Sequence, residues 1–131
     1  MPRKKAESYT NSKELPIYKQ TTHIMDLVDN LMTKVLRRDI KHTYGQHMLS
    51  IVIDMLGCIS QAYLIEEERV NHLKRYIAYL DNLSTLLNLC ERKGYLVGKK
   101  GNEYVSFIKP MASVEAQVQG WLKSTTQPES E

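Results

Sequence analysis

The residues most suited to chemistry are a run of cations in VLRRDIKHTYGQ, Val35–Gln46. Arg37, Arg38, Lys41 and His42 fall within six positions there. Lys and Arg side chains neutralise phosphates and release the counterions condensed on nucleic acid. A corner between two helices needs only polar residues or a glycine. The charge of this segment therefore indicates an anionic partner, with an ordinary solvated surface as the alternative.

Patterns that would indicate catalysis or a metal site are weak. No two of the histidines are four positions apart, there is no Glu-x-x-His, and Cys58 and Cys90 form no C-x-x-C. A nucleophile elbow and paired carboxylates beside a histidine are also missing from the sequence. GKKG, Gly98–Gly101, is similar to the G-x-x-G loop of KH domains, but that module needs a sheet, so we interpret the segment as a loop. We expect no catalytic residue, metal or cofactor.

The composition favours one helical domain. The chain has 131 residues, of which 42% are hydrophobic and 25% charged, with only six glycines and four prolines. No apolar N-terminal segment suggests a signal peptide, and no apolar run reaches the length of a membrane span. We therefore expect a cytoplasmic protein that does not contact membranes and keeps both cysteines reduced in its core.

Apolar residues recur every three or four positions in four segments, which predicts four amphipathic helices. The segments are Leu15–Arg38, Thr43–Glu67, Val70–Lys93 and Glu103–Ser124. Gly94 should end the third helix. In the fourth, the predicted buried face consists of Tyr104, Ile108, Met111, Val118, Trp121 and Leu122. Pro110 should either kink that helix or delay its start. We expect tails at residues 1–14 and 125–131, with the folded domain at residues 15–124.

In the third helix, Tyr76 and Tyr79 flank the apolar position Ile77. Both rings cannot point in the direction of Ile77. We expect at least one tyrosine at the margin of the apolar stripe, either at a protein interface or at the edge of the core.

Short connections favour an all-α, antiparallel up-down-up-down four-helix bundle, because each stripe must be buried against its neighbours. In that topology the first and third corners share one end, which we call the basic pole. It consists of Lys34, Arg37, Arg38, Lys41 and His42 from the first corner, and Arg92, Lys93, Lys99 and Lys100 from the third. The opposite end receives Glu66, Glu67 and Glu68.

The candidate nucleic-acid-binding residues come mainly from this pole. They are Arg37, Arg38, Lys41, Lys93, Lys99 and Lys100, to which charge alone adds Lys74 and Arg75 of the third helix. Several cations acting together suit a phosphate backbone.

Four motifs, taken in order, are similar to a known family. They are LPIYK at Leu15–Lys19, RRDIKHTYG before the second helix, QAY at Gln61–Tyr63 and GWLKS at Gly120–Ser124. This order resembles a four-helix-bundle family that includes the proteins encoded in intervening sequences of large-subunit ribosomal RNA genes. The same family includes the accessory variability determinant (Avd) proteins of diversity-generating retroelements, to which this chain looks closest.

The resemblance implies a non-catalytic homopentamer with a positive surface. Such a protein binds nucleic acid, template RNA or cDNA, and the retroelement's reverse transcriptase, and supports mutagenic reverse transcription. Arg37, Arg38 and Lys41 match the family's basic first corner. The alternative is a structural or protein-interaction bundle of the ribosomal intervening-sequence type, with no nucleic-acid role.

Overall fold

The computed structural model describes residues 11–98 and 101–126, and this part of the chain is all-α apart from one short strand pair. The long helices are α2 (Pro16–Asn30), α4 (Gln46–Leu64), α5 (Arg69–Arg92) and α6 (Val105–Thr126). Shorter helical segments are η1 (Ser12–Glu14), η2 (Leu31–Val35), α3 (Arg38–Ile40), η3 (Lys41–Gly45) and η4 (Glu66–Glu68). The all-α class predicted from the sequence is confirmed.

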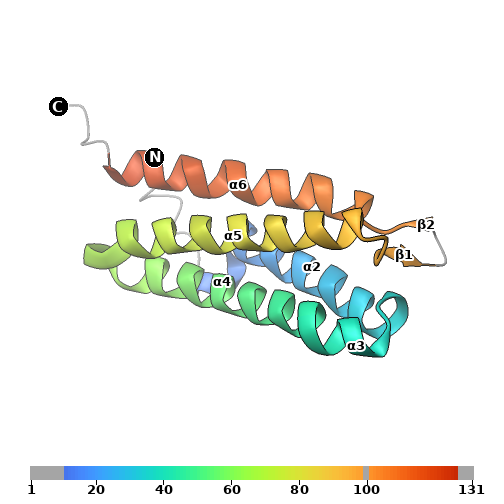
Figure 1. Ribbon diagram of the computed structural model, residues 1–131. Helices are drawn as coiled ribbons and strands as arrows, with labels where there is room; N and C mark the ends of the chain where they lie inside the picture. The colour runs from blue at the N-terminus through green and yellow to red at the C-terminus, as the bar shows by residue number, and fades with distance from the viewer. Residues whose placement is uncertain (1–10, 99–100, 127–131) are drawn as a thin grey trace.

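The long helices lie side by side (Figure 1). α4 packs against α2 and α5, and α6 packs against the same two helices. The connection from α2 to α4 lies at the same end of the molecule as the strand pair between α5 and α6, whereas η4 lies at the other end (Figure 1). The first and third connections are therefore close in space.

The core is built from the apolar stripes of α2, α4 and α5, largely as the sequence predicts. The fully or almost fully buried side chains of these helices include Ile24, Val28, Met48, Met55, Ile59, Leu73, Leu83, Leu87 and Cys90. Tyr76 is also fully buried, whereas Tyr79 is half-buried at the edge of the core. The prediction that one of the two tyrosines lies at the margin is confirmed.

The buried face of α6 differs from the predicted one. Its buried side chains are Phe107, Pro110, Val114 and Val118. Ile108, which was predicted to be buried, is 52% exposed. Two apolar stripes about 100° apart run along this helix, and only one can face the core. The helix also begins at Val105, ahead of Pro110, so the proline neither delays its start nor ends it. Within the helix it removes the backbone bond to the Ser106 carbonyl, and its ring crowds that carbonyl.

The first corner is shorter than predicted. The predicted helices leave the four residues Asp39–His42 between them, but in the structure η2 ends at Val35 and α3 begins at Arg38, after which the helix continues through η3 into α4. Gly45 lies inside this helix, where an added Cβ would come within 3.1 Å of the Met32 and Leu36 side chains. Arg38, Lys41 and His42 therefore lie on the first turns of a long helix, and Arg37 immediately precedes it.

By length and composition, the helix from Arg38 to Leu64 would be able to cross a membrane. The sequence predicts no membrane span, and core helices of soluble proteins can have the same length and apolar composition. Its side chains at Met48, Val52 and Met55 are fully buried against neighbouring helices. We assign its buried apolar residues to the core, whereas Ile53 and Leu64 on the same helix are exposed.

The folded region extends past both predicted boundaries. Residues 11–14, which were predicted to belong to the tail, include η1, and the buried Ser12 Oγ lies 3.1 Å from Ser60 Oγ. At the other end α6 continues to Thr126. A polar stretch without periodicity can still be ordered when it packs against a neighbouring helix.

A short strand pair joins α5 to α6. β1 (Val97–Gly98) runs antiparallel to β2 (Gly101–Asn102), with Val97 opposite Asn102. Gly98 lies so close to the first corner that an added Cβ would come 2.9 Å from Val35 Cγ2. The strand pair is absent from the prediction because two residues per strand give no detectable alternation.

α5 ends at a glycine, as the sequence predicts. Gly94 has a φ of +77°, and its N–H donates to the Glu91 carbonyl at 3.1 Å. The Tyr95 N–H donates to the Cys90 carbonyl at 2.9 Å. These two bonds form a Schellman motif, which satisfies carbonyls at the end of the helix.

We expect Gly94→Ala to lower the free energy of unfolding by about 1–2 kcal/mol, because a Cβ is strained at this positive φ. The matched control is Gly57→Ala in the middle of α4, where no described atom outside the adjoining helix backbone lies within 4 Å of the added Cβ. That change should instead raise stability by about 0.5–1 kcal/mol. Urea unfolding followed by circular dichroism measures both. Shifts of the same sign would contradict the assigned conformation of Gly94.

Candidate nucleic-acid interface

Arg37, Arg38 and Lys41 lie where the long second helix begins. Arg37 is the residue before α3 and Arg38 is its first residue, and both are exposed, while Lys41 is half-buried. The N-cap residue, Arg37, makes no side-chain capping hydrogen bond to this first turn. The positive end of the helix dipole therefore adds to the side-chain charges, and both attract phosphate oxygens.

One acidic residue lies within this group. Arg37 Nη2 is 3.7 Å from Asp39 Oδ2, and the two side chains are 72% and 73% exposed. An ion pair that is this exposed contributes at most about 1 kcal/mol. Arg37 can therefore exchange Asp39 for a phosphate at little cost.

Packing contacts hold the third connection against the first corner. The rings of Tyr44 and Tyr95 lie 5.9 Å apart at an angle of 46°. Leu96 is buried, and Gly98 lies against Val35. These contacts place the carboxyl end of α5 beside the start of α3.

The basic pole therefore receives cations from two parts of the chain (Figure 1). Arg92 ends α5 and Lys93 follows it, and both are exposed. Lys34 and His42 are exposed on the first-corner side. The predicted candidates Lys99 and Lys100 lie outside the described residues.

Two predicted candidates do not belong to this group. Lys74 and Arg75 lie in the other half of α5, and Lys74 is about 28 Å from Lys93 by the rise of the helix. Lys74 lines a groove between α5 and α6. The Tyr79 side chain interacts with Arg75 and is the main cause of a raised Arg75 pKa. The prediction included these residues because it counted charge without measuring position along the helix.

Both thiols, Cys58 and Cys90, are buried. Burial raises the pKa of the Cys58 thiol, although the nearby Arg75 cation opposes this, and burial also raises the pKa of the Cys90 thiol. Each thiol is therefore less ionised near neutral pH than a free one. Among residues 11–98 and 101–126, no group of three or more His, Cys, Asp and Glu side chains is placed to hold a metal ion.

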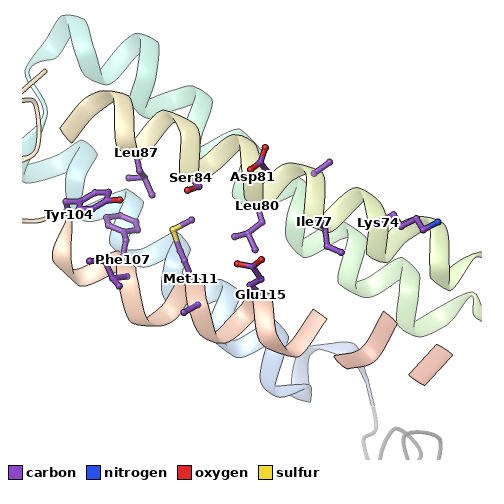
Figure 2. A pocket seen from close by; sticks show the side chains of 13 residues that line it. Lys74, Ile77, Leu80, Asp81, Ser84, Leu87, Tyr104, Phe107, Met111 and Glu115 are labelled. Carbon is purple, nitrogen blue, oxygen red and sulfur yellow. The ribbon is translucent and has the colours of Figure 1, made fainter. Parts of the chain in front are cut away.

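The sequence reasoning did not find the groove between α5 and α6 (Figure 2). Its lining comes from two separate helices and depends on the distance between them, so no local motif signals it. The sequence feature that could have indicated the groove is the second apolar stripe of α6, which contains Ile108.

Comparison with known proteins gives no match to a family model, a curated protein or a solved structure. The family resemblance therefore rests on the four sequence motifs. In the structure LPIYK begins α2, RRDIKHTYG spans α3 and η3, QAY ends α4, and GWLKS lies in the last turns of α6. All four motifs fall at or near ends of helices.

Proposed function

We propose that this chain is an antiparallel up-down-up-down four-helix bundle and a non-catalytic accessory protein of a diversity-generating retroelement. In this role it binds template RNA or cDNA through phosphate contacts and binds the reverse transcriptase. Both partners and the homopentameric state follow from the family resemblance, whereas the cytoplasmic location is the expectation drawn from the sequence.

The main support is the gathering of cations at the basic pole. Arg37, Arg38 and Lys41 at a helix N-terminus lie at the same end as Arg92 and Lys93. The formal net charge of the chain is only +3, so this pole concentrates charge that the total conceals. In a closed ring of identical subunits the pole would repeat in every copy, which increases the field that attracts an anionic polymer.

A salt titration with a labelled single-stranded RNA of mixed sequence tests the nucleic-acid role. Phosphate contacts predict binding that depends little on sequence and weakens steeply between about 50 and 200 mM salt. Fluorescence anisotropy measures the affinity, and light scattering gives the number of subunits. Absence of binding at the lower salt concentration would refute the proposal.

The structural or protein-interaction bundle is the second candidate. The observation in its favour is the groove between α5 and α6, which leaves apolar side chains such as Ile108 exposed. This candidate predicts an intact assembly that binds a protein partner and ignores RNA. The same titration separates the two candidates.

A further inference from the structure

A long groove separates α5 from α6 on the outside of the molecule (Figure 2). Its volume is about 610 Å³. Along α5 the lining runs from Lys74 to Leu87, and along α6 from Tyr104 to Glu115. The α5 side therefore measures about 20 Å, which is the length of nearly four turns of an α-helix.

The floor of the groove is apolar. Leu80 and Phe107 are buried beneath it, and Ile77 and Met111 are half-buried. Ile77, Leu80 and Met111 point into the space between the two helices (Figure 2). An apolar side chain bound on this floor would lose its contact with water, and the floor would lose its own. Binding is favoured because both apolar surfaces are buried.

The wall formed by α6 exposes further apolar surface. Ile108 is 52% exposed, and the exposed Ala112 continues its face at helical spacing. Ala112 and Ala78 are small and belong to opposite walls. Small residues in both walls let another backbone approach closely. Apolar side chains arranged in this way suit an opposing helix.

Two carboxylates border the apolar floor. Asp81 on α5 and Glu115 on α6 are both exposed, and neither forms an ion pair within the described residues. Leu80 and Glu115 point toward one another across the groove (Figure 2). The one cation in the lining, Lys74, lies about 10 Å along α5 from Asp81. The middle of the groove is therefore acidic on both sides.

We propose that this groove binds one amphipathic helix of a partner protein, which presents apolar side chains at i, i+3 or i+4, and i+7. Lys or Arg residues flanking that stripe pair with Asp81 and Glu115. The inference rests on the proposed function, because a reverse transcriptase is the protein partner there. It gives that partner a surface separate from the basic pole, so RNA and protein are held by different sides of the molecule.

A second copy of this chain fits the groove less well. The exposed apolar side chains outside the groove include Ile53 and Leu64 on α4. Asp54 lies on the same exposed face and would bring a third carboxylate next to Asp81 and Glu115. Charge therefore favours a partner helix with cations over the α4 helix of another copy.

The test uses the full chain and a labelled helical peptide of about 14 residues, with leucines on one face and lysines flanking them. We expect saturable binding by fluorescence anisotropy. Ile108→Gln should weaken it about tenfold, because an apolar contact of the groove is lost. Asp81→Lys combined with Glu115→Lys should have a similar effect at low salt. A peptide with glutamates in place of the lysines should bind the charge-reversed protein better than the natural one.

Matched controls distinguish peptide binding in the groove from nonspecific binding elsewhere on the surface. Ile53→Gln changes an isoleucine that is 53% exposed, nearly the same as Ile108, but lies outside the groove. Asp26→Lys combined with Glu67→Lys makes the same change in net charge away from the groove. Both controls should leave the peptide affinity within about twofold of the natural protein. Circular dichroism establishes that each variant is folded.

Equal effects of the groove and control variants, or no peptide binding, would overturn the inference. Sedimentation velocity adds a third arm, since an assembly that dissociates in Ile108→Gln would show that the groove holds a second copy instead. Measuring RNA affinity on the same samples distinguishes the two proposals. RNA binding without peptide binding refutes only the groove, and peptide binding without RNA binding refutes only the nucleic-acid role.

Discussion

Changing Arg37, Arg38 and Lys41 together to Glu should weaken RNA binding about 100-fold near 50 mM salt. Three attractions to phosphate are lost, and three repulsions replace them. The slope of log affinity against log salt should also become shallower by about 2, since each single-strand phosphate contact contributes about 0.7 to it. Anisotropy titrations at several salt concentrations measure both changes.

Folding should survive this substitution. Arg37 and Arg38 are exposed, and all three residues lie at the start of the helix that begins with α3. Negative side chains are favourable there because they complement the positive end of the helix dipole. A loss of RNA binding can therefore be attributed to the surface, and an unchanged unfolding midpoint would verify this.

The control is a triple reversal with the same change in net charge. Lys13, Lys19 and Lys123 are exposed and lie away from the basic pole. Either triple variant changes the formal charge from +3 to −3, because each reversal subtracts two. If both weakened RNA binding equally, net charge rather than the basic pole would be responsible. Reversing Lys74 and Arg75 should have a smaller effect, since they lie far from the first corner.

The fold could be predicted where burial imposes a strict pattern. α4 and α5 are covered on their apolar sides, so residues such as Met55, Leu83 and Leu87 recur at helical spacing. The first corner was harder, because the first turns of an exposed helix accept the same polar residues as a loop. In α6 the competing stripe through Ile108 masked the stripe through Phe107 and Val114, and only packing decides between them.

The candidate site could also be predicted only in part. Connectivity alone placed Arg37 and Lys93 at one end, because short connections force neighbouring helices to reverse direction. Charge alone could not show that Lys74 lies far from the basic pole, because that distance depends on its position along α5. The groove beside Lys74 depends on the separation of two helices, which no local pattern encodes.

Tyr76→Ala should lower the free energy of unfolding by about 3–5 kcal/mol, a large part of the stability of a typical domain. Tyr76 is fully buried, and its hydroxyl lies 2.8 Å from Thr21 Oγ1. Thr21 in turn donates to the Ile17 carbonyl at 2.7 Å, so Tyr76 is the donor to Thr21. The substitution removes a large ring from the contact between α2 and α5 and leaves a cavity. Urea unfolding measures the loss.

Tyr76→Phe separates the hydroxyl from the ring. At pH 7 it should cost only about 1 kcal/mol, the usual contribution of one hydrogen bond. Burial raises the pKa of Tyr76 above its ordinary value, because the ionised phenol is desolvated. The unfolded chain therefore ionises first as the pH rises above about 10. The natural protein then loses stability because Tyr76 ionises in its unfolded chain, whereas the Phe variant has no such group. The difference in the free energy of unfolding between the two proteins should therefore shrink.

Tyr79→Ala is the matched comparison, since it removes the same side chain three residues away. Tyr79 is half-buried at the edge of the core and interacts with the exposed Arg75. Because water can fill the space that the ring leaves, the loss should be about 1 kcal/mol. Sequence periodicity alone treats these two tyrosines alike, whereas the structure gives them different environments. Equal losses at the two positions would mean that α5 is rotated from the orientation described here, and the groove between α5 and α6 would then have a different lining.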